Sequence, residues 1–580
     1  MILVFGGTTE GRKAVEVLEE AGKVYYYSTK TGEQDITLHH GQRINGALDV
    51  EAMQAFCCDH EIRLIVDAAH PFASQLHENI AQVSVSQNIP VIRYERIYPP
   101  RDPEMEWIDD YSQIPTDIHT LLATTGVQSI SHLKWLEKLG IKVIYRILNR
   151  ESSIQLAHQQ GATDNQLCFY PQTADAEAVL MKESGESGGF NEKVKEAKEK
   201  GMRIIVLKRP QFSIFNFQFS IVNGPYGLRR AVERLLPEFY PLHSGLTTGT
   251  CATAAAVAAT LRLLRNEMLE EVPILLPDGE TIDVPVGYGK DYAYCIKEAG
   301  DDPDVRNGVE VRASVEYANV FEIRGGEGVG IFTLPGFDYP PGSPAINKAP
   351  REMIENNIQT ILSPLTSQLP PLIITISVPQ GEEIARRTFN PRLGIEGGIS
   401  IIGVSGIVMP FSEEAFIESI CKCMTVAKAS GSDRVVINSG GKSERFVKAL
   451  YSKLPRQAFV EYGNYIGETL KIAHELGFKE VTLGVMLGKA VKLAAGHLDT
   501  HSRKSVMDKS FIQQMLTEVE CDIDISEMTL ARELWEKLPS NKLNSFASTV
   551  IRHCADYCNP LLPNGSLTIL LIDDDGHIYE

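Results

Sequence analysis

Two glycine-rich segments that each run into a helix constrain the fold of this chain most strongly. Residues 1–11 read MILVFGGTTEG, a strand-like run followed by a glycine turn, and residues 243–256 read HSGLTTGTCATAAA, a Gly/Thr loop that opens an alanine-rich helix. Such a loop presents free backbone N–H groups and the positive end of a helix dipole, which suits an anionic ligand. Two such starts about 240 residues apart predict two modules, each longer than a minimal domain.

The composition argues against several classes of protein. The 580 residues carry a formal net charge of −19 and a pI near 5.3, which argues against a nucleic-acid or anionic-membrane partner. The amino end has no basic leader and no apolar run is as long as a membrane span, so we expect a cytoplasmic protein. The ten cysteines are scattered without a paired CxxC pattern, so we expect reduced thiols and no metal site.

The first 240 residues alternate between strand-like and helical patterns. Strands are expected at 2–5, 24–27, 64–67 and 91–93, separated by helices at 9–21, 50–59 and 73–88. This alternation predicts a parallel sheet with helices on both faces. A Pro- and acid-rich stretch at 95–110 leads to further strands at 121–124, 142–146 and 203–207. We therefore expect a module over 1–240 with two Rossmann-like halves, about 1–100 and 111–240, and a cleft between them.

A linker near 237–246 leads to a second module, expected over 241–580. Its first part, about 243–363, has a strong helical pattern at 250–266 and a hairpin signal at Asp278-Gly279, so we predict an α+β subdomain. The α/β alternation returns over 364–580, with strands expected at 373–378, 434–437, 459–462 and 481–485. Polar or glycine-rich loops follow these strands, and open α/β sheets bind their ligands at such strand ends.

The first glycine loop has the context of a dinucleotide-binding fingerprint. It follows a strand and precedes a helix, with Thr8 in place of the second glycine. A plain strand-to-helix turn is the alternative. The second strand ends without an acidic residue for the ribose of NAD, so Ser28 and Lys30 could instead meet a 2′-phosphate, and the sequence does not separate NADH from NADPH. The candidate cofactor-binding residues are Gly6, Gly7, Thr8, Thr9, Gly11, Ser28 and Lys30.

Two further features of the first module carry polar chemistry. His70 follows the strand that ends at Asp67, where it could act as a proton donor or a partner for a carboxylate, or simply cap a turn. The segment 182–189 reads KESGESGG, a Ser/Gly loop before a helix that could bind an anion, although a surface turn is favoured.

The second module offers four candidate clusters. Thr247, Thr248 and Thr250 open the alanine-rich helix and could bind a carboxylate or phosphate, with an ordinary helix cap as the alternative. Asp301 and Asp302 could bind Mg²⁺ or a cationic group, although an acidic turn is favoured. Residues 496–503 read GHLDTHSR and include His501 as a candidate acid or base. Lys489 and Lys492 share a helix face three residues apart.

With these segments in view, the chain resembles two families of cobalamin biosynthesis. Residues 1 to about 240 resemble the precorrin-6A reductase family through ILVFGGTTEGR, DAAHPFA and the stretch from KESG to LKRP. Residues from about 243 to 580 resemble the cobalt-precorrin-5B C1-methyltransferase family. That resemblance rests on several long motifs in order, among them SGLTTGTCATAAA, KEAGDDPDV, GEGVGIFTLPG, INKAPREMI, TFNPRLGIEGGISIIGVSGIV, GNYIG and AAGHLDTHSR.

The resemblance implies two consecutive reactions on a tetrapyrrole. The second module would methylate C1 of cobalt-precorrin-5B with S-adenosylmethionine, and the first would reduce the resulting cobalt-precorrin-6A with NADH or NADPH. The substrate's carboxylates need cationic and N–H partners, and the methyl-donor site is expected in the loops at 438–441, 463–467 and 484–489. His501 is the first candidate for a base, and His70 for a donor near the nicotinamide. The carboxylate candidates are Arg386, Arg387, Arg392, Lys489, Lys492 and Arg503, and the donor-site candidates are Gly440, Gly441, Gly463, Asn464, Gly467 and Gly488.

Two other interpretations stay open at this point. An active methyltransferase could carry a degenerate reductase module that serves as a tetrapyrrole carrier, as Thr8 in the fingerprint would allow. Alternatively, an unrelated Rossmann oxidoreductase could be fused to a small-molecule kinase, although the chain has no GxxxxGK[ST] phosphate loop at the second start. We expect tetrapyrrole substrates, neither nucleic acid nor membrane as partner, and a possible homo-oligomer. Fusion of successive steps would pass an unstable intermediate at high effective concentration.

Overall fold

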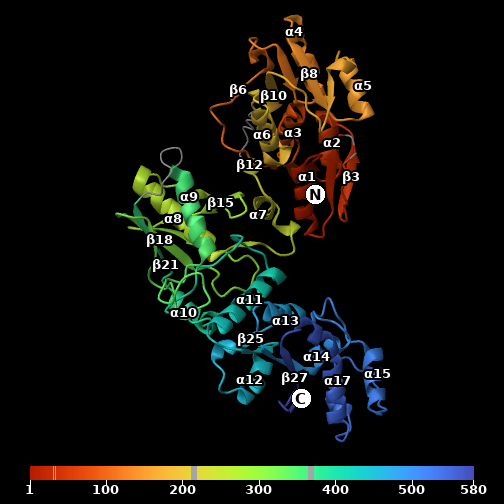
Figure 1. Ribbon diagram of the computed structural model, residues 1–580, viewed down its shortest axis with the longest axis vertical. Coiled ribbons are helices and arrows are strands. Elements are labelled where there is room, and N and C mark those ends of the chain that lie inside the picture. The colour runs from red at the N-terminus through yellow and green to blue at the C-terminus, as the bar shows by residue number, and fades with distance from the viewer. Residues whose placement is uncertain (31, 33, 211–218, 363–370) are drawn as a thin grey trace. The chain divides into compact units, whose positions relative to one another are not determined.

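The computed structural model describes residues 1–30, 32, 34–210, 219–362 and 371–580. The chain forms two compact units (Figure 1). The first unit comprises Met1–Ser244 and Pro273–Asp283, and the second comprises Gly245–Val272 and Val284–Glu580. No helix in the described ranges is long and apolar enough to cross a membrane.

The first unit begins with a six-stranded, fully parallel sheet in the order β12-β5-β4-β1-β2-β3. Strands β1, β2, β4 and β5 are buried along their whole length, as expected for parallel strands covered on both faces. Alternate residues of β1 pack against α1 and α7 on one face and α2 and α3 on the other. The elements are β1 (Ile2–Phe5), α1 (Thr9–Glu19), β2 (Tyr25–Thr29), β3 (Gly41–Asn45), α2 (Val50–Asp59), β4 (Leu64–Asp67), α3 (Ser74–Gln87), β5 (Val91–Tyr94), β12 (Phe219–Val222) and α7 (Pro225–Leu235).

A second parallel sheet of six strands, in the order β6-β11-β10-β7-β8-β9, forms the other half of this unit. The prediction of two parallel-sheet halves is confirmed. However, the chain returns to the first half after β11, because β12 pairs with β5 and α7 covers that sheet. The elements are β6 (Glu106–Ile108), β7 (Thr120–Ala123), α4 (Ile130–Lys138), β8 (Lys142–Ile147), α5 (Glu151–Gln159), β9 (Leu167–Phe169), β10 (Ala178–Lys182), α6 (Phe190–Glu199) and β11 (Arg203–Leu207).

The predicted hairpin at Asp278-Gly279 is present as β14 (Glu271–Leu275) and β15 (Thr281–Pro285). Its position in the sequence predicts a place in the second module, whereas residues Pro273–Asp283 pack with the first unit. The reason is Glu280, which is 1% exposed and accepts hydrogen bonds from the backbone N–H groups of Tyr226 and Gly227 in the first turn of α7. Burial raises the pKa of the Glu280 carboxyl to about 7.

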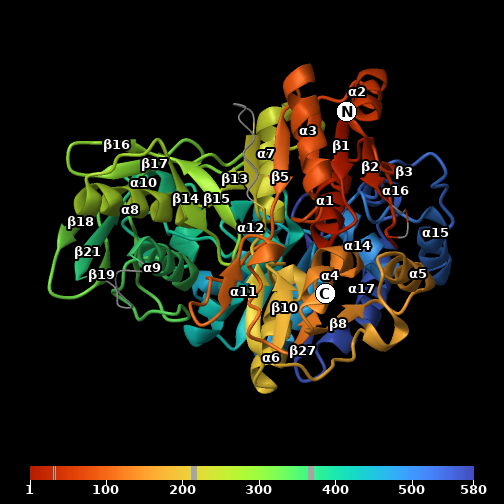
Figure 2. The same cartoon turned by 90° about the horizontal axis from the view of Figure 1, so that it is seen from above.

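The second unit opens with helices α8 (Thr248–Arg265) and α9 (Lys348–Leu362) beside a five-stranded mixed sheet (Figure 2). All α8 residues from Thr248 to Leu261 are buried, because alanine side chains let the helix approach α9 and the sheet closely. The sheet order is β16-β17-β18-β21-β19. The strand expected at 373–378 as the start of the α/β part is β21 in this mixed sheet, and its alternating burial fits that place. The strands are β16 (Gly287–Tyr288), β17 (Ala293–Ile296), β18 (Glu310–Tyr317), β19 (Glu322–Gly325) and β21 (Leu372–Ser377).

The remainder of the second unit is the expected α/β part. Its sheet has the order β25-β24-β26-β27-β28, parallel except for β28. The α+β and α/β composition predicted for this module is thereby confirmed. The main elements are α11 (Glu413–Ala429), β24 (Arg434–Asn438), α12 (Gly441–Leu450), β25 (Phe459–Glu461), α13 (Ile466–Glu475), β26 (Glu480–Met486), α14 (Leu487–Ala494), α17 (Leu543–Cys558), β27 (Ser566–Ile572) and β28 (Ile578–Tyr579).

Candidate functional sites

The glycine loop of the first unit turns sharply from β1 into α1. The Thr8 hydroxyl accepts a hydrogen bond from the Gly11 N–H at 2.9 Å and donates one to the Ala68 carbonyl at 2.6 Å, so it caps the helix. A side chain at position 6 would overlap the Tyr27 ring, which explains Gly6. By contrast, a Cβ atom at Gly7 would meet no atom of the described residues within 4 Å. The loop therefore has an open outer face that fits the close approach of a ligand.

The carboxyl end of β2 lies beside this loop. The Ser28 carbonyl accepts the Gly6 N–H at 3.0 Å, so the strand end and the loop are held together. Ser28 is buried and Lys30 is exposed. The hydroxyl of Thr29 is buried and has no hydrogen-bond partner among the described residues. This strand end carries no carboxylate for a ribose.

His70 sits above a buried polar network at the end of β4. Asp67 bonds the His77 ring at 2.5 Å and the Arg93 guanidinium at 2.9 Å, and His77 also reaches the His70 carbonyl at 3.0 Å. Nδ1 of His70 accepts the Phe72 N–H at 3.2 Å, which leaves the ring proton on Nε2. Burial, with Arg96 and Lys182 nearby, lowers the pKa of His70 to about 4. His70 is thus a neutral hydrogen-bond donor at neutral pH rather than an imidazolium acid, and its part in catalysis stays a prediction.

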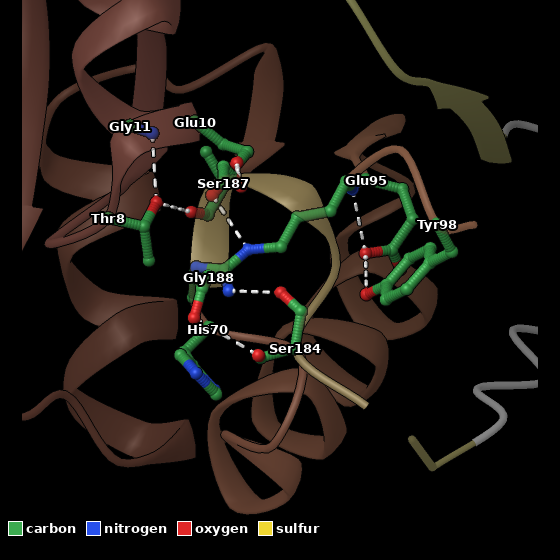
Figure 3. Close-up of polar contacts among 12 residues, drawn as sticks. Thr8, Glu10, Gly11, His70, Glu95, Tyr98, Ser184, Ser187 and Gly188 are labelled. Atoms are coloured by element: carbon green, nitrogen blue, oxygen red, sulfur yellow. Dashed lines mark hydrogen bonds and ion pairs between the residues drawn. The ribbon is translucent and has the colours of Figure 1, made fainter. Parts of the chain in front are cut away.

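A buried ion pair at the edge of the first half contacts the Ser/Gly loop of the second half (Figure 3). Glu10, in the first turn of α1, accepts a hydrogen bond from Nε of Arg96 at 2.9 Å and another from the Ser187 hydroxyl. Arg96 also donates to the Ser184 carbonyl at 2.7 Å. Both charged side chains are about 6% exposed. Ser184 and Ser187, in the KESGESGG loop, therefore contact the start of α1 through Arg96 and Glu10. This role of Arg96 was not identified from the sequence.

A cavity of about 790 Å³ lies at the carboxyl ends of the second half's strands. Phe72 closes one side, and the remaining lining side chains are largely charged or polar. Arg101 and Arg209 both bond Glu183, at 3.0 and 3.2 Å. Lys182 differs, because it has no carboxylate partner in the described part of the chain and lies 5.0 Å from the centre of the Phe72 ring. Burial lowers the pKa of the Lys182 ammonium.

In the second unit the threonine motif is engaged with the chain itself. The Thr248 hydroxyl donates to the Ile402 carbonyl at 3.2 Å and accepts the Ile402 N–H at 2.9 Å. The Thr250 hydroxyl donates to the Gly406 carbonyl at 2.5 Å, and Thr247 caps the helix by accepting the Thr250 N–H. These threonines are at most 8% exposed. The motif holds the 402–406 loop, and its predicted role in binding substrate stays a prediction.

The acidic turn after β17 is built around a different aspartate from the two predicted. Asp304 pairs with Lys297 at 2.8 Å and Arg306 at 2.7 Å, and these cations lower the pKa of its carboxyl against the effect of burial. Asp301 is exposed, and Asp302 accepts the Phe411 N–H at 3.4 Å. No group of three potential metal ligands occurs in the ranges that the structure describes.

The predicted donor loops of the second unit do come together at the carboxyl end of its parallel sheet. Lys489 donates to the Gly463 carbonyl, and the Asn464 carbonyl accepts the Thr500 N–H at 3.0 Å. Lys492 reaches the Thr500 carbonyl at 3.3 Å. The loop 463–467 and the 496–503 motif are therefore one structural cluster.

Other residues of this cluster are placed as follows. The Gly467 N–H donates to the Leu498 carbonyl at 3.1 Å. Nδ1 of His501 accepts the Arg503 N–H at 3.2 Å, and the Arg503 side chain is exposed. Burial lowers the pKa of Lys489 to about 8.

Arg392 is the one predicted arginine that joins a charged cluster here. It forms an ion pair with Glu444 at 2.7 Å, close to Glu461. Arg386 and Arg387 are exposed, and Arg386 lies 3.5 Å from Glu382. Glu461 itself, the last residue of β25, was not among the predicted site residues, although its place at a strand end was a usable signal.

Two family models match the chain in succession. A model described as precorrin-6x reductase CbiJ/CobK matches residues 1–223, and one described as CbiD matches residues 237–410. The chain is 41% identical over 353 residues to the cobalt-precorrin-5B C(1)-methyltransferase of Prosthecochloris aestuarii, covering 58% of this chain and 95% of that protein. It is 42% identical over 280 residues to the protein of that name from Thermus thermophilus, covering 47% and 74%.

Solved structures show similarity to each part. The cobalamin biosynthesis protein CbiD from Archaeoglobus fulgidus is 30% identical, with 45% of this chain and 83% of that chain covered and a TM-score of 0.27. A CobK precorrin-6A reductase is 16% identical, with 41% and 96% covered and a TM-score of 0.33.

Proposed function

We propose that this chain, which belongs to the cobalt-precorrin-5B C(1)-methyltransferase family and carries a precorrin-6x reductase domain before it, catalyses two consecutive steps of cobalamin biosynthesis. The second unit methylates C1 of cobalt-precorrin-5B with S-adenosylmethionine, and the first reduces the resulting cobalt-precorrin-6A with NADH or NADPH. The observation that carries the proposal is the succession of both family matches on one chain, at 1–223 and 237–410.

The cavity of the first unit suits the tetrapyrrole substrate. Its volume of about 790 Å³ falls in the range of small-molecule sites. Lys182 projects a cation that has no carboxylate partner in the described chain, and burial in the cavity wall strengthens its attraction for an anion. A propionate or acetate of the macrocycle is such an anion. Phe72 adds an apolar surface beside it.

The glycine loop is the proposed place for the nicotinamide cofactor, which supplies the hydride when it is bound. The open face at Gly7 fits the approach of a pyrophosphate, and the strand end at Ser28 and Lys30 fits a phosphate better than a bare ribose because it has no carboxylate. His70, with Nε2–H as its free donor, orients a substrate group by a hydrogen bond. Burial, together with the neighbouring Arg96 and Lys182, lowers the pKa of His70 and so disfavours a second proton on its ring.

The second unit needs chiefly to align a methyl donor with C1, because the sulfonium carries its own leaving group. The loops at 440–441, 463–464 and 488–489 are the proposed donor site. Lys492, Arg392 and Arg503 are the proposed partners for substrate carboxylates, and His501 is the proposed base that removes a proton from the macrocycle. Nδ1 of His501 accepts the Arg503 N–H, so this nitrogen carries the lone pair and the ring proton lies on Nε2. His501 therefore takes up the macrocycle's proton at Nδ1, after the Arg503 N–H releases it.

Mass spectrometry of cobalt-precorrin-5B incubated with the purified chain and S-adenosylmethionine tests both steps. We expect a gain of one CH₂ without a nicotinamide, and two further hydrogens when NADH or NADPH is added. Comparison of the two nicotinamides identifies the preferred one. Methylation that never proceeds to reduction would favour the carrier alternative for the first unit, and intact, unmodified substrate would contradict the proposal as a whole.

A further inference from the structure

Glu461 is a partly buried carboxylate that has no bonding partner among the residues the structure describes. In the described chain its side chain makes neither a hydrogen bond nor an ion pair, although two cations lie near it. Arg392 is already bound to Glu444 at 2.7 Å, and Lys489 donates to the Gly463 carbonyl. Burial raises the pKa of the Glu461 carboxyl. A carboxylate held in this way has unused acceptor capacity on both oxygens.

The position of Glu461 in the sheet is specific. It is the last residue of β25, and it pairs in register with Asn438, the last residue of the neighbouring strand β24. The chain leaves β24 through Gly440 and Gly441 into α12. A Cβ atom on Gly440 would lie 3.4 Å from Oε1 of Glu461. The carboxylate therefore stands directly beside the glycine turn that joins the first strand of this sheet to its helix.

The surroundings leave room and donors for a ligand. Within the described ranges, a Cβ atom at Gly441 or at Gly488 would have no neighbour within 4 Å. The start of α12 has no side-chain cap, so its first N–H groups are available. Asn438, fully buried beside Gly484, has an Oδ1 atom with no hydrogen-bond partner in the described chain. Two polar side chains at this strand end thus lack the partners that buried polar groups normally have.

The chemistry of this arrangement points to a ribose. In sheets of this topology, an acidic residue at the end of the second strand, about 20 residues after the glycine turn, accepts hydrogen bonds from ribose hydroxyls. Glu461 lies twenty residues after Gly441. The equivalent strand end in the first unit, Ser28 to Lys30, has no carboxylate. The two units therefore differ at the one position that distinguishes an unsubstituted ribose from a phosphorylated one.

We propose that Glu461 binds the adenosyl ribose of the methyl donor in the second unit, accepting hydrogen bonds from its 2′- and 3′-hydroxyl groups. This inference rests on the proposed function and adds the residue that selects the nucleoside part of the donor. The uncapped start of α12 and the open space at Gly441 directly follow Gly440, the residue of the turn that the carboxylate contacts.

The test is calorimetric binding of S-adenosylhomocysteine and its 2′-deoxy analogue to the full chain and to Glu461→Ala and Glu461→Gln. A hydrogen bond to a charged group is worth enough for us to expect roughly 10- to 100-fold weaker binding of S-adenosylhomocysteine by Glu461→Ala. The 2′-deoxy analogue should bind the unmutated chain about 10-fold less well than the parent compound, and this difference should vanish in Glu461→Ala.

Glu480→Gln is the matched control, because Glu480 begins β26 at the opposite end of the same sheet and pairs with Arg434. It should leave both affinities unchanged, and the isosteric Glu461→Gln should retain the thermal unfolding midpoint of the unmutated chain. Equal discrimination against the 2′-deoxy analogue with and without the carboxylate would overturn the ribose assignment alone. Failure of the unmutated chain to bind S-adenosylhomocysteine would overturn the methyltransferase proposal, and this inference with it.

Discussion

Lys182 is the side chain of the first unit that we propose binds a substrate carboxylate. Its neighbours Arg101 and Arg209 are both engaged by Glu183, whereas Lys182 lines the cavity and forms no ion pair with any carboxylate among the described residues. We expect Lys182→Met to raise the KM for the tetrapyrrole about 10-fold in steady-state reduction assays, with a smaller effect on kcat. Lys182→Arg should restore most of the affinity because it keeps the charge. An unchanged KM in Lys182→Met would show that the substrate carboxylates bind elsewhere.

His70 gives the first unit a pH dependence whose sign follows from its pKa. The folded-state value of about 4 lies below the 6.5 of a free imidazole, so the unfolded chain binds more protons between these values. The free energy of unfolding therefore falls as the pH falls through this window. His70→Asn lacks the titrating ring, so its free energy of unfolding should fall less between about pH 7.5 and about pH 4.5, by roughly 1–3 kcal/mol. Urea unfolding at the two pH values measures this, and parallel pH dependence would contradict it.

At the scale of elements, a substitution at the start of α8 can test whether the threonine motif stabilises the fold or binds substrate. Thr248 serves both the N–H and the carbonyl of Ile402, so Thr248→Val leaves two backbone groups without that partner. We expect the free energy of unfolding of the second unit to fall by about 1–3 kcal/mol. Thr248→Ser keeps the hydroxyl and serves as the control. If Thr248→Val instead raised the KM for cobalt-precorrin-5B at unchanged stability, the threonine motif would bind substrate as the sequence suggested.

One buried ion pair, Glu10 with Arg96, makes hydrogen bonds to Ser184 and Ser187 of the other half of the first unit. Arg96→Met leaves Glu10 buried without its cation, and we expect the free energy of unfolding to fall by about 3–5 kcal/mol. The double variant Glu10→Gln with Arg96→Met should lose less than the two single variants together, because no uncompensated charge remains. Strictly additive losses in denaturant unfolding would show that the two side chains act independently.

The sequence predicted well those elements whose own residues determine their secondary structure. The parallel strands at 2–5 and 64–67 are continuous apolar runs between helical patterns, and burial on both faces requires that composition. The predicted sheet for strand β21 was wrong, because the sequence of a short apolar strand does not specify which strands it pairs with. The same limit hid the return of β12 to β5 and the contact of Glu461 with the turn at Gly440, since both join residues that are distant in sequence.

At the scale of the whole molecule, the consequence of fusion is measurable with full-length chains. Thr9→Trp and Gly441→Trp each place a bulky side chain over one glycine loop, at an exposed position, and should disable one unit apiece. An equimolar mixture of the two variants should accumulate more free cobalt-precorrin-6A than an intact chain with the same number of active sites. The reason is that the linker keeps the two units together, so each unit meets the other's active site at an effective concentration on the order of millimolar. Equal accumulation would show that the intermediate equilibrates with solvent.

The hairpin that carries Glu280 affects where the chain could be divided between two genes, as well as how it folds. Its residues lie within the stretch that matches the methyltransferase family, yet they pack with the reductase unit and cover the start of α7. If the gene were divided in the linker near residue 240, the first unit would therefore lose the hairpin, which is encoded after the linker. The N–H groups of Tyr226 and Gly227 would then lose the carboxylate that they bond, so the first unit depends on residues encoded beyond the linker.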